Sequence, residues 1–318
     1  MPTMQNAHID RALTNISVAY LQDASAFIAD KVFPIIPVKR QSDVYYQYSK
    51  ADFMRDEAQV RGAATESAGG DYGVEAQSPY YCKTHAFHKD VTPEERANYD
   101  EPLDADKDAT NFVSQKMLIR REMEWASKFF KAGVWGTEIA GTAAAPGAGA
   151  TLQWDQATSN PIKDITDAAV KMASETGYKP NTLVLSPYAF YALKNHEDIL
   201  DRIKYTQKGI VTEDLLAQLF EVDRVFVAWS VVNSAKKGAD ASVDFIYGKG
   251  ALLCYSTPTA GYIMSWTGLE GAGAYGNRIV RLPMDMLGLG TERIEGEMAF
   301  DAKLICKDMG VFFKDIVA

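Results

Sequence analysis

The clearest alternation of apolar and polar residues lies within residues 179–229. An apolar run at 182–185 predicts a buried strand, and Ser186-Pro187 directly after it is a typical helix start, an N-cap followed by proline. Thr212-Glu213-Asp214 marks another helix start, and 222–229 predicts a second strand. Strands that alternate with helices in this way predict a layered α/β unit.

A long amphipathic helix is predicted over residues 106–131, which contain neither Gly nor Pro. About 26 helical residues make a rod of ~39 Å. Apolar side chains at helical spacing predict its buried face: Phe112, Ile119, Met123, Ala126 and Phe130. Asp104, Asp106 and Asp108 stand at its start, where carboxylates cap free N–H groups. Gly133 and Gly136 are expected to end it.

Two more helices and a long β region complete the pattern. Thr92-Pro93-Glu94-Glu95 is a capping box that starts a short helix, and Pro161 opens an amphipathic helix that Gly177 stops. Between these helices, residues 136–160 are rich in Gly and Ala and predict a loop or linker. After Asp244, aromatic and β-branched residues dominate, which predicts mostly strands.

Residues 42–91 predict a long hairpin, because residues 44–48 and 81–87 both alternate as strands do. Between these flanks, 56–73 is small, charged and Gly-rich, as an exposed tip is. Two arms of roughly 15 residues would reach about 50 Å. Few large aliphatic residues sit on the hairpin, so we expect contact with another copy to order it. A flexible loop on a monomer is the alternative.

Residues 1–41 predict an N-terminal arm. Pro34 and Pro37 remove two N–H donors, so the sequence VFPIIPVKR is expected to be extended. We expect this arm to lie across a neighbouring copy and its first dozen residues to be a frayed terminus.

Composition bounds the class of protein. With 318 residues, 47% hydrophobic and 24% charged, the chain falls in the globular class. It has no run of 18 apolar residues to span a membrane and no secretion signal at its start. Three widely spaced cysteines argue against a disulfide framework and for a reducing compartment. The net charge of −9, with scattered Lys and Arg, disfavours sequence-specific DNA recognition.

One glycine pattern resembles a nucleotide site. Gly271-Ala-Gly273-Ala-Tyr-Gly276 matches the dinucleotide-binding motif letter for letter. That motif requires a helix after its last glycine to hold the pyrophosphate, whereas the β-branched residues that follow, NRIVRLP, predict a strand. The pattern therefore indicates a glycine-rich turn between strands, and we predict no cofactor-binding residue.

Metal and catalytic patterns are also incomplete. On a strand, Cys82 and His88 share one face while His85 points to the other, and a fourth ligand is missing. Asp104, Asp106 and Asp108 depart from a calcium loop at Ala109 and Gln115, and helix capping explains them. Ser186 lacks the nucleophile turn, and His8 and His196 are isolated in the sequence. We predict no metal site and no catalytic residue, although a triad could still assemble in space.

Three stretches carry a resemblance to a known family: DKVFPIIPVKRQSDVYYQYSKADFMRDEA at 30–58, WDQATSNPIKDI at 154–165, and the sequence from PNTLVLSPYAF to VVNSA at 180–235. Together they resemble the major capsid proteins of tailed bacteriophages over nearly the whole chain. The resemblance implies an α+β fold, the phage major capsid fold that encapsulins share. Its parts are an N-arm, an extended E-loop hairpin, a peripheral domain with the spine helix, and an α/β axial domain.

By this resemblance the chain divides as follows: the N-terminal arm at 1–41, the E-loop at 42–91, the peripheral domain at 92–164 with the spine helix at 105–132, the axial domain at 165–255, peripheral strands at 256–299, and a C-terminal strand that returns to the axial domain at 300–318. No fused scaffolding segment is apparent before the arm, so a separate scaffolding protein is expected. Some relatives crosslink their loops through lysine and asparagine; Lys50 lies in the hairpin, but without a matching asparagine we predict no crosslink.

The resemblance also implies a function. Copies are expected to form hexamers and pentamers that close an icosahedral phage head, a virion capsid assembled in the host cytoplasm around double-stranded DNA. Contact with that DNA would be non-specific, which suits a mildly acidic wall. A portal, and in some relatives a decoration protein, are the other implied partners. Two alternatives stay open here: an encapsulin-type compartment with protein cargo, and a nucleotide-binding enzyme.

Overall fold

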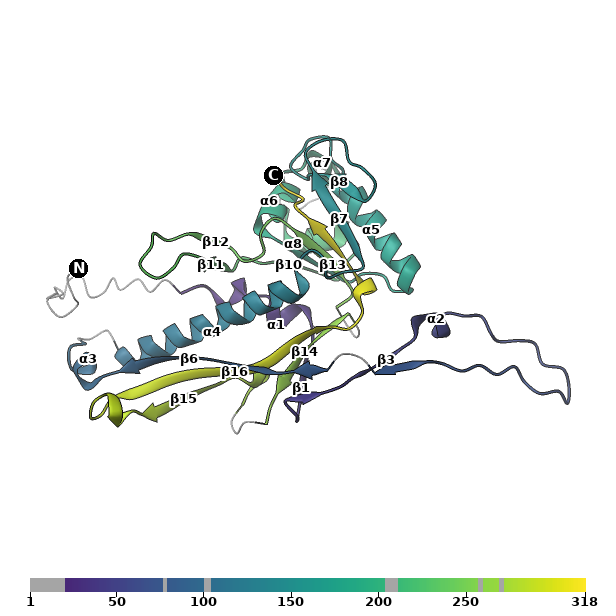
Figure 1. Ribbon diagram of the computed structural model, residues 1–318. Coiled ribbons are helices and arrows are strands. Elements are labelled where there is room, and N and C mark those ends of the chain that lie inside the picture. The colour runs from purple at the N-terminus through teal and green to yellow at the C-terminus, as the bar shows by residue number, and fades with distance from the viewer. Residues whose placement is uncertain (1–20, 77–78, 100–103, 204–210, 257–259, 269–271) are drawn as a thin grey trace.

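The computed structural model describes all residues except 1–20, 77–78, 100–103, 204–210, 257–259 and 269–271. Two β-sheets form the framework, and a long helix lies along one of them (Figure 1). A narrow ribbon leaves the body on one side and extends far beyond it (Figure 1). Within the described part of the chain, no helix is long and apolar enough to cross a membrane.

The first sheet has five strands: β1 (Ile35–Val38), β6 (Lys83–Val91), β14 (Gly261–Trp266), β15 (Arg278–Pro283) and β16 (Glu292–Leu304). β16 pairs antiparallel with β6, β14 and β15, and β1 joins in parallel beside β14. The long β16 gives β6 a continuous ladder from Lys83 to Val91. The return arm of the predicted hairpin therefore belongs to this sheet, and the free ribbon ends near Tyr81, before the predicted boundary at residue 91.

The predicted long helix is confirmed as α4 (Ala105–Phe129), with Asp104 accepting the backbone N–H groups of Asp106 and Lys107. Its predicted buried face is wrong in part, because Phe112 is 44% and Met123 40% exposed. The side that faces the protein is made of Ala105, Ala109, Val113, Met117, Glu122, Trp125, Ala126 and Phe129. Small residues let the helix sit close to the sheet: a Cβ at Gly296 of β16 would lie 2.7 Å from Val113 Cγ1. The helix thus carries two apolar stripes, and the buried one is small near its start, at Ala109 and Val113, and aromatic near its end, at Trp125 and Phe129.

The second sheet has six strands in the order β10-β9-β13-β17-β7-β8. Their bounds are β7 (Thr137–Thr142), β8 (Ala150–Leu152), β9 (Thr182–Leu185), β10 (Arg224–Val227), β13 (Ala251–Cys254) and β17 (Gly310–Lys314). The prediction of a linker at 136–160 is wrong, because β7 and β8 lie there. At Gly141 a Cβ would lie 2.3 Å from the backbone oxygen of Asp315, so close strand packing demands the small residue that made the segment look like a loop.

Helices cover the second sheet: α5 (Pro161–Thr176), α6 (Pro187–Asn195), α7 (Glu197–Ile203) and α8 (Glu213–Leu219). Their predicted start signals are confirmed. Ser186 accepts the N–H of Ala189, Thr212 accepts that of Leu215, and Gly177 ends α5 with a φ of +75°. The parallel pair of β9 and β10, with helices between them, is the predicted layered α/β unit.

The remaining elements are short. α3 (Pro93–Ala97) starts at the predicted capping box, where Thr92 accepts the N–H of Glu95. Three small two-stranded sheets lie outside the main ones: β2 (Ser42–Asp43) with β5 (Tyr80–Tyr81), β3 (Tyr46–Tyr48) with β4 (Val74–Ala76), and β11 (Val231–Asn233) with β12 (Val243–Phe245). Short helical turns complete the chain: η2 (Ala24–Ala26), α1 (Ala29–Val32), α2 (Lys50–Phe53), η3 (Ala274–Gly276), η4 (Asp285–Leu287) and η5 (Lys307–Met309).

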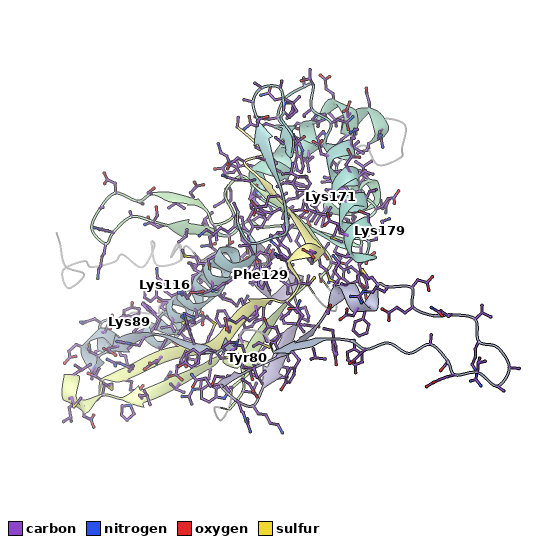
Figure 2. All side chains as sticks on the ribbon, turned by 45° about the vertical axis from the view of Figure 1, so that its right-hand side comes forward. Tyr80, Lys89, Lys116, Phe129, Lys171 and Lys179 are labelled. Carbon is purple, nitrogen blue, oxygen red and sulfur yellow. The ribbon has the colours of Figure 1, made fainter. Side chains whose placement is uncertain are left out.

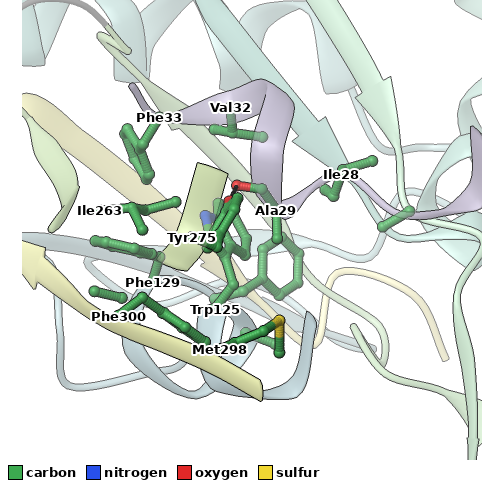
Figure 3. Close-up of a cluster of buried hydrophobic side chains, with 14 of the residues drawn as sticks. Ile28, Ala29, Val32, Phe33, Trp125, Phe129, Ile263, Tyr275, Met298 and Phe300 are labelled. Atoms are coloured by element: carbon green, nitrogen blue, oxygen red, sulfur yellow. Dashed lines mark hydrogen bonds between the residues drawn. The ribbon is translucent and has the colours of Figure 1, made fainter. Parts of the chain in front are cut away.

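The described N-terminal segment packs inside its own subunit. Phe27, Ala29, Val32 and Phe33 are at most 1% exposed. Phe33 lies against Trp125 and Phe129 of α4, with ring centroids 5.8 and 4.6 Å apart (Figure 3). The predicted extended segment is confirmed as β1, but the expectation that the arm lies across a neighbour is wrong for residues 27–33, whose apolar side chains are buried in their own subunit. Its apolar residues fill the core between α4 and the first sheet. The predicted frayed end lies outside the described residues.

From these contacts we propose a domain division that differs from the predicted one at two edges. Residues 137–152 pair with strands of the second sheet, although they were assigned to the peripheral domain. β16 runs unbroken to Leu304, past the predicted boundary at residue 300, and the crossing to the second sheet occurs at η5. With these changes, we propose that the first sheet and α4 form the peripheral domain and the second sheet the axial domain.

Candidate assembly surfaces

The ribbon at residues 42–81 is largely exposed apart from Tyr80 at its root, and most of its described side chains project into solvent (Figure 2). Every residue from Met54 to Val74 is exposed. The base of the ribbon is fixed to the body: Gln47 Nε2 donates to Ile305 O at 3.2 Å, and Lys50 Nζ lies 3.2 Å from an Asp308 carboxylate oxygen. Both contacts lie beside η5, where the chain crosses between the two sheets. The ribbon is therefore fixed to the body at its root and exposed to solvent from Met54 to Val74.

Three aromatic side chains gather on the ribbon without a core beneath them. Tyr48, Phe53 and Tyr72 have ring centroids 5.6–5.8 Å apart. They remain 57%, 64% and 57% exposed. Isolated two-stranded hairpins are marginally stable in water, and clustered exposed aromatic residues mark contact surfaces. This aromatic cluster has the chemistry of an interface.

A second exposed apolar surface lies on the body, on the outer side of α4 and the neighbouring strand β6. Phe112 of α4 packs edge-on against Phe87 of β6 at 5.6 Å, and Met123 continues the stripe along the helix. Lys116 lies above the Phe112 ring at 5.4 Å. We call Phe87, Phe112, Ile119 and Met123 the outer stripe. Phe112, Ile119 and Met123 belong to the face that the helical spacing predicted to be buried, and Phe87 comes from β6. The other two residues of that predicted face, Ala126 and Phe130, are buried.

A third surface is the turn between β15 and β16, where Met286 and Leu289 are 90% and 92% exposed and Leu287 53%. Gly288 and Gly290 have φ values of +131° and +81°, which hold this turn in a conformation that presents the apolar side chains outward. The sequence pattern did not single it out, because three apolar residues near a turn resemble the continuation of a strand.

The buried centre of α4 holds a carboxylate that sequence reasoning missed. Glu122 is 0% exposed, and its two oxygens accept the N–H groups of Ile28 and Ala29 at 2.8 and 3.0 Å. Tyr247 Oη donates to it at 2.6 Å. Burial raises the pKa of Glu122, while these hydrogen bonds act in the opposite direction. The carboxylate links α4 to the N-terminal segment and to the loop before β13. These three hydrogen bonds hold parts of the fold together.

The structure brings one serine and one histidine together, but the direction of their hydrogen bond does not suit catalysis. Ser159 Oγ lies 3.0 Å from His196 Nε2, and both side chains are buried. His196 Nδ1 accepts the backbone N–H of Asp198, so the proton of the neutral ring is on Nε2, which faces the serine. Ser159 Oγ in turn donates to Gln156 O at 2.7 Å. A general base must accept the serine proton; this pair instead anchors the start of α7.

The other candidates for chemistry are held in structural contacts. Cys82 is buried against Met264 O, and burial raises the pKa of its thiol to about 11. His85 packs against the Phe300 ring and His88 is exposed. Ser186 is buried as a helix cap. In the part of the chain that the structure describes, no three His, Cys, Asp or Glu side chains gather as metal ligands would.

The glycine motif leads into a strand, as predicted. Gly271 lies outside the described residues, but from Gly273 the chain makes the short turn η3 and enters β15 at Arg278. Tyr275 within the turn is buried, has a φ of +64°, and donates its hydroxyl to Ala29 O at 2.9 Å (Figure 3). The turn thus holds the N-terminal segment through the Ala29 carbonyl, while Glu122 holds it through the N–H groups of Ile28 and Ala29.

Comparison with known proteins agrees with this architecture. Residues 143–267 match the family model described as phage major capsid protein E. The major capsid protein of Burkholderia phage BcepMu is 25% identical over 253 residues, 78% of this chain and 76% of the relative. That of Pseudomonas phage JBD67 is 26% identical over 326 residues, 98% of this chain and 97% of the relative.

Solved structures show the same fold. A phage-related protein from Bordetella bronchiseptica RB50 superimposes with a TM-score of 0.68 at 21% identity, covering 93% of this chain and 94% of that one. The capsid of cyanophage P-SCSP1u gives 0.61 at 10% identity, over 99% and 92%. The SrpI encapsulin from Synechococcus elongatus PCC 7942 gives 0.57 at 12% identity, over 97% and 96%.

The fold and the sequence relatives together define a structural shell protein, and the nucleotide-binding enzyme considered from the glycine motif is wrong. Within that class, the chain is related to the phage major capsid proteins and has their α+β capsid fold. Its function is that of a phage capsid subunit.

Proposed function

We propose that copies of this chain form hexamers and pentamers that close an icosahedral phage head around double-stranded DNA. The observation that carries the proposal is the ribbon at 42–81, which is ordered at its base, bears an aromatic cluster, and has its described length uncovered within the subunit. A ring of subunits covers such a ribbon if each copy lays it on the next.

The outer stripe of α4 and β6 is the surface we propose to receive it. Phe87, Phe112 and Met123 are exposed and lie together on a rigid helix and strand. Both surfaces are apolar and aromatic, so their association removes two exposed patches from water at once. The ribbon is also acidic: residues 52–71 hold five carboxylates and two arginines, a net charge of −3. Lys116 on the outer stripe has the complementary charge.

The test is removal of the ribbon tip. A variant that lacks residues 56–73 should remain folded, because those residues make no contribution to the described cores, and it should fail to form shells. A matched control replaces 56–73 with a Gly/Ser segment of equal length, which keeps the connection and removes the surface. Intact shells from both variants, seen by electron microscopy, would exclude the role proposed for the ribbon.

An encapsulin-type compartment is the second candidate, favoured by the fold that this chain shares with the Synechococcus encapsulin. Both candidates predict closed shells, and the two can be distinguished by the molecules that the shells enclose. Particles that yield long double-stranded DNA after nuclease treatment and protein extraction support the phage head; particles that hold a single foreign protein and no DNA support the compartment.

The finer parts of the phage assignment rest on the same proposal. A separate scaffolding protein would set the curvature, a portal would occupy one vertex, and a decoration protein could bind outside. Assembly would take place in the host cytoplasm. Contact with the packaged DNA would be non-specific, since Lys and Arg are scattered and the net charge is −9.

A further inference from the structure

A second projection leaves the body on the side opposite the long ribbon. β11 and β12 form a small hairpin that extends over α4, while the ribbon at 42–81 extends the other way (Figure 1). We call residues 234–242 the basic tip, because they present Lys236 and Lys237 side by side, both exposed. In the described structure neither lysine forms an ion pair.

The basic tip is built to a fixed shape. Asn233 Oδ1 accepts the N–H groups of Ala235 and Ser242 at 3.0 and 3.1 Å, and Ser234 N donates to Ser242 O. Gly238, with a φ of +92°, completes the turn. At the base of the hairpin, the amide of Gln22 makes two hydrogen bonds to the free edge of β11, donating to Val231 O and accepting Val231 N. A loop held this way has little entropy to lose on binding.

Its aromatic residues hold the hairpin to the body but do not reach the tip. Phe245 packs against Tyr188 and Trp229, and Tyr188 Oη donates to Asp244. Val243 is already 59% exposed. The hairpin therefore extends beyond the core that it helps to cover, and its outermost groups are two cations.

The long ribbon offers the opposite charge. Beyond Phe53 it carries Asp56 and Glu66, both exposed and without an ion pair in the described structure, while Arg55 pairs with Asp52 and Glu57. Its outermost part, residues 56–71, has one large apolar side chain among the described residues, Val60. Apolar contact alone cannot hold that part in place, so charge must contribute.

We propose that the basic tip of one copy holds the acidic segment 56–71 of the long ribbon from the neighbouring copy. In a ring of identical subunits, what projects from one side of a copy meets the opposite side of the next, and the two projections lie on opposite sides (Figure 1). The aromatic cluster would lie on the outer stripe, and Lys236 and Lys237 would fix the ribbon beyond it. This contact rests on the proposed self-assembly and names a second point of attachment within it.

The experiment is a charge-reversal exchange in the full chain. Lys236→Glu with Lys237→Glu should raise the protein concentration needed for assembly by about tenfold at low salt, as expected for reversing two exposed ion pairs. Asp56→Lys with Glu66→Lys should do the same, and the two sets combined should restore the wild-type concentration. Added salt should reduce the difference between wild type and either variant.

Lys171→Glu is the matched control for Lys237→Glu, since Lys171 is an exposed lysine on α5, away from both projections (Figure 2). It changes the net charge as much as Lys237→Glu alone does and should leave assembly unchanged, whereas Lys237→Glu alone should raise the concentration needed for assembly. The inference is overturned if the combined variant assembles no better than either set, or if reversing the two lysines has no effect. It is equally overturned if that reversal leaves shells intact but abolishes DNA retention, which would assign the lysines to DNA. A wild-type chain that never assembles would instead overturn the proposed function.

Discussion

Phe53 gives the sharpest quantitative test of the ribbon as an interface. It is 64% exposed in the subunit and belongs to the aromatic cluster. A phenylalanine contributes about 200 Å², so roughly 130 Å² is available for burial by a neighbour. At about 25 cal/mol per Å², full burial is worth about 3 kcal/mol, and half burial about 1.5 kcal/mol. Phe53→Ala should therefore weaken each contact by about 10- to 150-fold.

The assay is the protein concentration at which light scattering and sedimentation first detect assembled particles. Phe53→Ala should raise it at least tenfold, and Phe53→Tyr, which keeps the ring, should leave it near the wild-type value. The unfolding free energy of the unassembled subunit should change by less than about 0.5 kcal/mol, because the side chain is exposed there. An unchanged assembly threshold in Phe53→Ala would refute the reasoning. So would a large loss of subunit stability, which would mean that the ring serves its own subunit.

Four further predictions concern the subunit itself. Glu122→Ala leaves two backbone N–H groups and the Tyr247 hydroxyl without an acceptor and should lower the unfolding free energy by about 3–5 kcal/mol in urea titrations, against little change for Glu124→Ala. Burial raises the pKa of Glu122 above 4.5, so protonation of Glu122 stabilises the folded state fully below pH 4.5, and this stabilisation is lost as the pH rises through the folded pKa. The unfolding free energy of the wild type relative to Glu122→Gln should therefore fall with rising pH. A free-energy difference that does not change with pH would contradict this. Gly141→Ala should lower the unfolding free energy by about 1–3 kcal/mol, because the added methyl group clashes with the Asp315 backbone. Gly147→Ala, with open space around the added methyl group, should leave the unfolding free energy unchanged. Equal effects of the two substitutions in urea titrations would count against the close packing of β7 and β17. Cys254, fully buried with its pKa raised to about 12, should react with thiol reagents at pH 8 only after unfolding, and rapid labelling of the native subunit would disagree with its position in β13.

Local signals in the sequence were sufficient for most elements. Thr92, Ser186 and Thr212 start helices as their side chains predict, since each caps the N–H three residues on. Gly177 ends α5 because only a residue without a Cβ readily takes its positive φ. These signals act within one turn of chain, so the sequence displays them directly.

Features that depend on distant segments could not be predicted in the same way. β7 and β8 are strands because the C-terminal strand β17 pairs with β7, 174 residues later in the chain (Val311 with Thr137), and their Gly and Ala residues allow that close packing. The buried side of α4 was misassigned because the helix has two apolar stripes. Periodicity cannot say which stripe meets the sheet, and Gly296, which lets Val113 approach, lies far away in sequence.

The same limit applied to the candidate sites. Glu122 gave no signal, because its partners are backbone groups nearly 100 residues away and a tyrosine 125 residues on. The ribbon was predicted from its alternation and its poverty of aliphatic residues, which are local properties, although its aromatic cluster needed the turn at α2 to bring Phe53 beside Tyr48 and Tyr72.

Electron microscopy of the purified chain at high concentration and moderate salt tests the central claim most directly. The account predicts closed shells of uniform size, with six- and five-fold clusters of subunits and density for the ribbon lying over the adjacent copy. A population that stays monomeric across the whole concentration range, with its ribbon folded onto its own body, would contradict it.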